Sequence, residues 1–365
     1  MSLSLKKHEQ MLLALLRASL QQTEADSSLF QDATNTDWKA CYKLSAVQGV
    51  MAIAWDAVVK LPAELLPPVA VKLSWATGVE KYEKQYSGYC AVAGELSAFY
   101  AEHGISTVLL KGVGLSTLYP VPSHREGGDI DIYTCSANKS KMSDAEANEL
   151  ANHLIMQKGI SVKFDHYKHS EFVYKGVSIE NHKHFVNVKV YKVAVKAEEI
   201  LHSIINPRFV KLEAGDVLVP SPEFNSLFVV FHAAQHYGCG MTLHHLCDWA
   251  VILNSYGLNI PAEFDDKRFI NAMNALTLIC NKYLGTSVKV DGSEQLMDEV
   301  LNEILHPKFS AHIETNNRFG ILLYKTRRML YGHKLTSRFF RTSLLKRICS
   351  SAVSHLLKPE SIFAK

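Results

Sequence analysis

Two aspartates one residue apart, Asp129 and Asp131, lie in the stretch REGGDIDIY at residues 125–133. Alternate side chains of a β-strand face the same side, so the two carboxylates project together while Ile130 and Ile132 point into the core. Neighbouring carboxylates repel each other unless a cation lies between them. Magnesium prefers oxygen ligands and often uses one or two protein carboxylates together with substrate phosphates. Taken alone, such a triplet is more often a solvent-facing strand end with two acids.

The residues around this pair shift the balance towards phosphate chemistry. Lys111 and Gly112 form a turn in LLKGVGL, one strand earlier, and Gly128 directly precedes Asp129. A glycine turn that opens a helix presents backbone N–H groups to a phosphate. Arg125 carries a permanent charge and a bidentate fork, so we expect a phosphate contact, or else a salt bridge to a nearby acid. Lys111 either contacts a phosphate or caps the turn.

The elements that position these residues follow from the hydrophobic pattern. Residues 5–103 are predicted to be almost wholly helical and to end at Gly104. Two strands, at 105–110 and 129–134, flank a helix that starts at the glycine turn. Ser143 and the acids after it predict a helix at 143–159. Further strands are predicted at 161–167, 170–176, 177–185, 209–214 and 216–220. Helical periodicity resumes at 221 and continues nearly to the end of the chain.

Along the chain, a strand is followed by the residues LKG, a helix, the residues YP and the motif R..GDIDI. This succession resembles the uncharacterised nucleotidyltransferase family of the DNA polymerase β-like superfamily. The stretch SIENH at residues 178–182 resembles the family's strand with a third acid followed by a histidine. The segment FHAAQHYG…LHHLCDWAVIL resembles its histidine-rich helices that end in an aspartate. The core of the resemblance runs through Leu110, Lys111, Gly112, Leu115, Tyr119, Pro120, Arg125, Gly128, Asp129 and Asp131.

The resemblance implies an α+β fold with a small mixed polymerase β-like sheet. We expect an N-terminal helical region at 1–92, a nucleotidyltransferase core at 93–220, and a C-terminal helical region with a basic tail at 221–365. The implied enzyme moves a nucleoside monophosphate from an NTP, such as ATP, to a hydroxyl-type acceptor, with two Mg²⁺ ions as cofactors. The acceptor class is open and includes small molecules, proteins and RNA. The alternative is a non-catalytic nucleotide- or RNA-binding module.

The resemblance also implies the roles of single residues. Glu180 is preferred over Asp165 as the third acid because VSIENH alternates correctly and matches the acid-x-His order. His182 either orients this acid or binds phosphate. The predicted catalytic residues and metal ligands are Asp129, Asp131 and Glu180. The predicted nucleotide-binding residues are Lys111, Gly112, Arg125, Gly128 and His182.

Two other clusters have a structural and a functional interpretation. His232 and His236 are spaced i, i+4, with His244, His245 and Asp248 beyond them. The spacing fits zinc, but the ligand set is not closed, so we expect these histidines to line the interface between the helices and the sheet. Residues 315–359 contain no Asp or Glu, and basic residues accumulate there. They attract RNA or another anion, or they form a solvated helix face, which we favour. Among the basic residues of this range are Lys325, Arg327, Arg328, Lys334, Arg338, Arg341, Lys346 and Arg347.

Bulk properties place the chain among ordinary globular proteins. Its 365 residues predict two or three structural units, and a net charge of +3 does not imply a polyanionic partner. The seven cysteines include no CxxC pair, which predicts buried free thiols in a reducing compartment. The apolar N-terminal stretch is interrupted by Arg17 and has the period of an amphipathic helix. We therefore expect no signal peptide, no membrane span and a cytoplasmic location.

Overall fold

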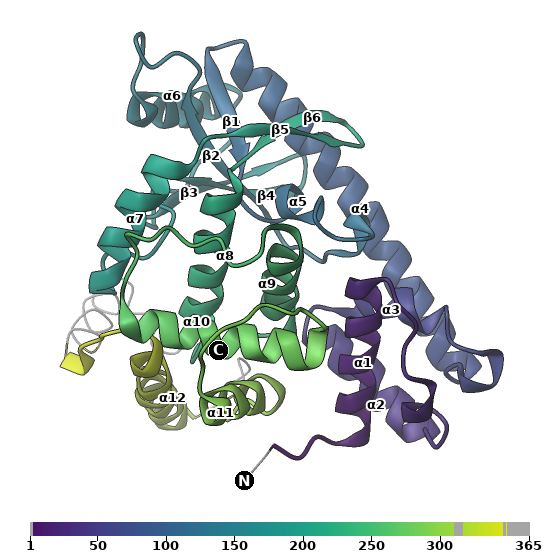
Figure 1. Cartoon of the computed structure of the whole chain (residues 1–365). Coiled ribbons are helices and arrows are strands. Elements are labelled where there is room, and N and C mark those ends of the chain that lie inside the picture. Colours follow the sequence, from purple (N-terminus) through teal and green to yellow (C-terminus); the bar gives the residue numbers. More distant parts are fainter. Residues whose placement is uncertain (1–2, 310–316, 346–347, 349–365) are drawn as a thin grey trace.

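A six-stranded mixed sheet lies between helices from both ends of the chain (Figure 1). The computed structural model describes residues 3–309, 317–345 and 348. The strand order is β3-β4-β2-β1-β6-β5. The strands are β1 (Ile105–Leu109), β2 (Ile130–Ser136), β3 (His169–Tyr174), β4 (Val177–His182), β5 (Arg208–Leu212) and β6 (Gly215–Val219). The predicted α+β fold with flanking helical regions is confirmed.

The N-terminal helices are α1 (Lys7–Gln21), α2 (Asn35–Val47), α3 (Met51–Val58) and α4 (Val69–Ala101). Helix α4 runs from this group to the sheet (Figure 1). Within the sheet region lie α5 (Val113–Ser116), α6 (Asp144–Gln157) and α7 (Lys192–Ile204). The C-terminal helices are α8 (Pro222–His236), α9 (Leu243–Tyr256), α10 (Lys267–Ile279), α11 (Glu294–Leu305) and α12 (Arg318–Phe339). The predicted boundary at residue 92 lies inside α4, and the division into three regions stays a prediction.

The pairing of the central strands decides which side chains share a face. β2 runs antiparallel to β1 and parallel to β4, and Asp131 lies opposite Glu180 in this register. Ile130 and Ile132 pack in the core that α4 and α6 cover. Because side chains alternate along a strand, Asp131 projects from the opposite face, towards the C-terminal helices.

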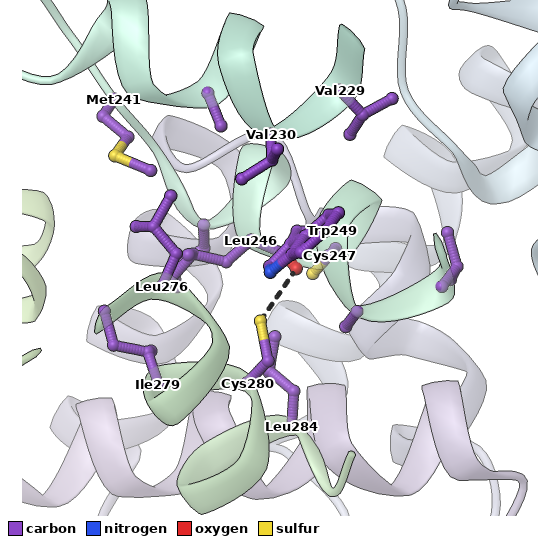
Figure 2. Close-up of a cluster of buried hydrophobic side chains, with 14 of the residues drawn as sticks. Val229, Val230, Met241, Leu246, Cys247, Trp249, Leu276, Ile279, Cys280 and Leu284 are labelled. Atoms are coloured by element: carbon purple, nitrogen blue, oxygen red, sulfur yellow. Dashed lines mark hydrogen bonds between the residues drawn. The ribbon is translucent and has the colours of Figure 1, made fainter. Parts of the chain in front are cut away.

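The C-terminal helices share a dense core with the N-terminal helices, and this core fixes the face of α9 that meets the sheet. Figure 2 shows α8, α9 and α10 meeting around Trp249, whose indole N–H donates to Thr277 Oγ1 at 3.0 Å. The Cys280 thiol donates to the carbonyl of Leu246 across the same core. Trp249 is fully buried, so its neighbour Asp248 is held at a defined place on the helix.

A buried histidine joins the N-terminal helices to the loop that precedes β2. The two ring nitrogens of His124 lie 2.7 Å from Asp56 Oδ1 of α3 and 3.0 Å from Glu83 Oε1 of α4. Burial lowers the pKa of His124, but hydrogen bonds to the two carboxylates outweigh it, so the pKa is raised above 6.5. A charged imidazole therefore stabilises this junction.

Several predictions about local structure were confirmed and others were wrong. The helix predicted at 143–159 is α6, and Ser143 caps it through the N–H of Glu146. The strand predicted at 161–167 is wrong, because this segment forms one isolated bridge, Lys163 to Glu171, outside the edge strand β3. Its Phe164 is exposed, so no apolar face holds a longer ladder in place.

The described cysteines are buried, with one exception. Cys239 is exposed, contrary to the prediction of buried thiols, while Cys41, Cys90, Cys135, Cys247 and Cys280 are free and buried. Cys349 lies outside the described residues. In the part of the chain that the structure describes, no helix has the length and hydropathy needed to cross a membrane.

Candidate active site

Three carboxylates meet at the ends of the central strands. Oxygen atoms of Asp129, Asp131 and Glu180 all lie within 4.8 Å of one another. Asp131 is buried, and the other two are partly exposed. The parallel pairing of β2 with β4 places Glu180 directly beside Asp131. Asp165, the rival third acid, is exposed on the segment outside β3 and does not belong to this carboxylate group.

The two aspartates differ in their affinity for protons. Burial alone would raise the pKa of Asp131, but the Lys111 ammonium and His182 outweigh it and hold that pKa below its ordinary value. Burial, followed by the charge of Asp131, raises the pKa of Asp129 to about 6. Asp131 is therefore ionised at neutral pH, whereas Asp129 takes up a proton in mildly acidic solution. A cation in the group would keep both carboxylates ionised.

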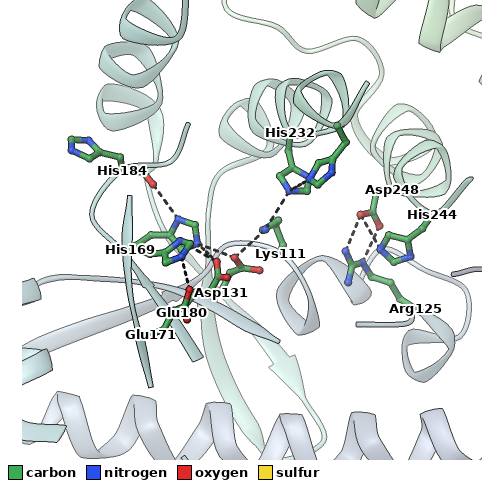
Figure 3. A network of polar contacts seen from close by, with 12 residues as sticks. Lys111, Arg125, Asp131, His169, Glu171, Glu180, His184, His232, His244 and Asp248 are labelled. Atoms are coloured by element: carbon green, nitrogen blue, oxygen red, sulfur yellow. Dashed lines mark hydrogen bonds and ion pairs between the residues drawn. The ribbon is translucent and has the colours of Figure 1, made fainter. Parts of the chain in front are cut away.

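Lys111 lies at the centre of the polar network shown in Figure 3. Its Nζ is 3.0 Å from Asp131 Oδ1 and 3.5 Å from His232 Nε2. The charges of Asp131 and the other acids raise its pKa despite a burial effect that lowers it. The sequence left two roles open for Lys111, a phosphate contact or capping of the turn. The geometry disfavours capping, because the ammonium points at the carboxylate group. A phosphate contact stays a prediction.

Arg125 forms a buried, bidentate ion pair with Asp248 of α9. Its Nε and Nη2 donate to Asp248 Oδ1 and Oδ2 at 2.9 and 2.8 Å. The Tyr119 hydroxyl donates to the same Oδ1 at 2.6 Å. Burial raises the pKa of Asp248, but Arg125 outweighs this effect and lowers it to about 2. The salt bridge considered from the sequence is thus present, with an acid far along the chain.

The two predicted nucleotide-binding glycines differ in how strictly they are required. Gly112 has φ +53°, a conformation that L side chains rarely adopt, and it opens the one-turn helix α5. Gly128 has open space where a Cβ would lie, and its carbonyl accepts a hydrogen bond from Tyr89 at 3.0 Å. A narrow hollow lies here beside Asp129. Its lining includes Tyr82, Tyr86, Tyr89, Gly112 and Arg125.

His182 lies inside the carboxylate group. Its Nε2 is 2.8 Å from Asp131 Oδ1 and 3.4 Å from Glu180 Oε2, and its side chain is fully buried. This position fits the prediction that it orients the third acid. A second histidine, His169 of β3, was missed in the sequence, although its Nδ1 lies 3.1 Å from Glu180 Oε2. His169 lies opposite His182 in the antiparallel pairing of β3 with β4, so a prediction of this hairpin's register would have identified it.

The helical histidines face the sheet across Lys111. Ring nitrogens of His232, His236 and His245 lie within 4.8 Å of one another. Burial, followed by the charge of Lys111, lowers the pKa of His232 well below 6.5 and that of His236 to about 4. Burial and His236 do the same for His245. These rings are neutral at physiological pH and lie between the C-terminal helices and the sheet, as the sequence predicted.

The basic C-terminal segment is only partly described. Arg338 of α12 forms an ion pair with Glu299 of α11. Phe339 and Phe340 are fully buried. The buried phenylalanines agree with the favoured amphipathic helix, but Phe319, Leu322 and Leu330 of α12 are exposed, so only part of its apolar surface is packed. Lys346 and Arg347 lie outside the described residues, and a role in RNA binding stays a prediction.

Comparison with known proteins gives one match. A family model described as "Uncharacterised nucleotidyltransferase" matches residues 34–285, more than half of the chain. The match includes the carboxylate group, Lys111, the Arg125–Asp248 pair and the helical histidines, and it confirms the resemblance noted from LKG and GDIDI. No curated protein and no solved structure matches the chain.

Proposed function

The chain belongs to the uncharacterised nucleotidyltransferase family, and we propose that it is a magnesium-dependent enzyme that transfers a nucleoside monophosphate from an NTP to a hydroxyl-type acceptor. The observation that carries this proposal is the group of three carboxylates on adjacent strands, with oxygens within 4.8 Å of one another. The acceptor is a small molecule, a protein or RNA.

The donor set suits magnesium, because Asp129, Asp131 and Glu180 offer hard carboxylate oxygens at one edge of the sheet. We assign these three residues as the ligands of two ions. Bound magnesium would neutralise the triphosphate and activate the attacking hydroxyl. His182 and His169 lower the pKa of Glu180 against the effect of burial, so Glu180 is ionised and available as a ligand.

Other residues of the site would orient the nucleotide. Lys111 uses one proton on Asp131 and has further N–H groups to donate to a phosphate oxygen. Arg125 has two nitrogens committed to Asp248, so its main part is to hold the loop before β2 against α9. We assign its third nitrogen, Nη1, to any phosphate contact. Gly112 lets the chain turn tightly after β1, beside the carboxylates.

The first test is calorimetric binding of ATP, GTP, CTP and UTP with Mg²⁺. We expect the wild type to bind at least one NTP, and Asp129→Ala and Asp131→Ala to lose binding by about 100-fold, since each removes a metal ligand. Asp165→Ala is the matched control, because this acid is exposed and lies outside the carboxylate group. Equal binding by wild type and the Asp129 and Asp131 variants, or no binding by any of them, would sink the metal-site interpretation.

A second test separates an enzyme from a binding module. Pyrophosphate release from an NTP in cell extract that requires Asp131 supports the enzyme. A gel shift with RNA that survives loss of both aspartates and disappears with Arg338→Ala/Arg341→Ala supports the module. Transfer of radiolabel from the NTP to macromolecules or to small molecules then identifies the acceptor class.

A further inference from the structure

The geometry points to a metal position of different chemistry beside the three carboxylates. We infer that His169, His182, Asp131 and Glu180 together bind a divalent transition metal of the zinc and iron class in preference to magnesium. The inference rests on the proposed function only in sharing Asp131 and Glu180 with the magnesium site.

His169, Glu180 and His182 lie at the spacing of a coordination shell, and Asp131 lies beside His182. His182 Nε2 is 2.8 Å from Asp131 Oδ1 and 3.4 Å from Glu180 Oε2, and His169 Nδ1 is 3.1 Å from Glu180 Oε2. Ligand atoms of His169, Glu180 and His182 all lie within 4.8 Å of one another. Metal–ligand bonds of 2.0–2.2 Å place neighbouring ligand atoms roughly 3.0–3.4 Å apart. Small shifts would therefore close the shell.

A hydrogen bond to the backbone holds the far side of the His182 ring. Its Nδ1 lies 3.1 Å from the backbone carbonyl of His184, and a carbonyl only accepts, so Nδ1 donates. On the other side of the ring, Nε2 is directed at the oxygens of Asp131 and Glu180. A backbone carbonyl that receives the other N–H is the usual support of a metal-binding histidine.

His169 repeats this arrangement with a carboxylate as its support. Its Nε2 lies 3.2 Å from Glu171 Oε1, which accepts the ring proton. Its Nδ1 is buried and makes no hydrogen bond, and Glu180 Oε2 lies 3.1 Å away. A carboxylate that holds one ring nitrogen while the other stays available to a metal is the usual support of a metal-binding histidine.

Ring nitrogens of His169 and His182 each lie against a carboxylate oxygen, so a cation held between them would contact both kinds of ligand. The donor set is two imidazoles and two carboxylates. Imidazole suits zinc, iron and related metals, whereas magnesium is bound by oxygen ligands, so the set selects the transition metals. The group of helical histidines contains no carboxylate.

Cobalt(II) is the probe, because its visible absorption reports the ligands around it. Wild-type protein titrated with Co²⁺ in a large excess of Mg²⁺ should develop an absorption band. His169→Ala and His182→Ala should each weaken Co²⁺ binding at least about 100-fold, and Glu171→Gln about tenfold, by the usual cost of losing a ligand or its support. His153→Ala is the control, because this histidine is exposed on α6 and bonds only Gln157.

Thermal melting of each variant shows whether it is folded. If His182→Ala is not folded, His169→Ala carries the test, because β3 is the edge strand of the sheet. An unchanged Co²⁺ affinity in His169→Ala, or no binding by the wild type, overturns the inference. Loss of the band in His236→Ala with retention in His169→Ala places the metal on α8 and also overturns it. Asp131-dependent binding of ATP with Mg²⁺ in the same proteins separates failure of this inference from failure of the proposed function.

Discussion

The ion pair between Arg125 and Asp248 is expected to contribute strongly to folding. The fall of the Asp248 pKa from 3.8 to about 2 corresponds to about 2.5 kcal/mol, at 1.36 kcal/mol per pH unit. Both side chains are almost completely buried. Removing one partner also leaves the other charge unpaired, so a single substitution should cost roughly 3–5 kcal/mol. Removing both should cost less than the sum of the two single losses.

Urea unfolding of the wild type, Arg125→Met, Asp248→Asn and the double variant measures these free energies. We expect a coupling of about 1–3 kcal/mol between the two sites. The pair's contribution is fully present above pH 3.8 and is lost as the pH falls towards 2, because the folded-state pKa of Asp248 is lowered. Lys84→Met is the control, since Lys84 and Glu80 form an exposed pair and its loss should leave stability unchanged.

Additive losses in this cycle would refute the reasoning, because they would mean that the two charges do not interact in the folded protein. Arg125→Lys adds a test of function. Lysine keeps the charge but loses the fork that matches a carboxylate at 2.8 and 2.9 Å. A large fall in ATP affinity without a change in stability would show that phosphate binding, and not the pair with Asp248, is the main role of Arg125.

Three further predictions concern the site and its supports. Because the Asp129 pKa is raised to about 6, calorimetric Mg²⁺ affinity should fall as the pH drops below 6, and Asp129→Asn should abolish this dependence. Because the pKa of His124 is raised, its contacts with the two carboxylates stabilise the protein fully below pH 6.5. This contribution is lost as the pH rises through the raised pKa. In urea unfolding, His124→Gln should therefore cost about 1–3 kcal/mol at pH 6 and less at pH 9. Gly112→Ala should destabilise the protein by roughly 1–3 kcal/mol, because φ is +53° there, whereas Gly128→Ala, with open space for a Cβ, should fold normally in the same assay.

The carboxylate group could be predicted because local rules determine it. The alternation of a strand places Asp129 and Asp131 on one side, and the alternation of VSIENH favoured Glu180 over Asp165. Parallel pairing of β2 and β4 then brings Glu180 beside Asp131. The sequence predicted a small mixed sheet, whereas its strand order was seen only in the structure.

The partners of the predicted residues could not be found in this way. Asp248 is 123 residues from Arg125, and their contact depends on how α9 packs on the sheet. The contact of Lys111 with His232 spans 121 residues and has the same origin. Helix α7 was also missed, although Ala194, Ala197 and Leu201 are spaced as one buried helical face and would have indicated it.

We expect the charges of the site to make the proposed nucleotide binding depend on a metal. Asp131 and Glu180 are ionised, and Asp129 joins them above about pH 6, whereas the nearby lysines are Lys111 and Lys168, and burial lowers the pKa of Lys168. Asp248 already neutralises Arg125, and His232 and His236 carry no charge at physiological pH. Without a metal, the site is thus negative overall and repels a triphosphate. A divalent cation on the carboxylates reverses this balance, so metal binding and NTP binding should strengthen each other and chelation should abolish both.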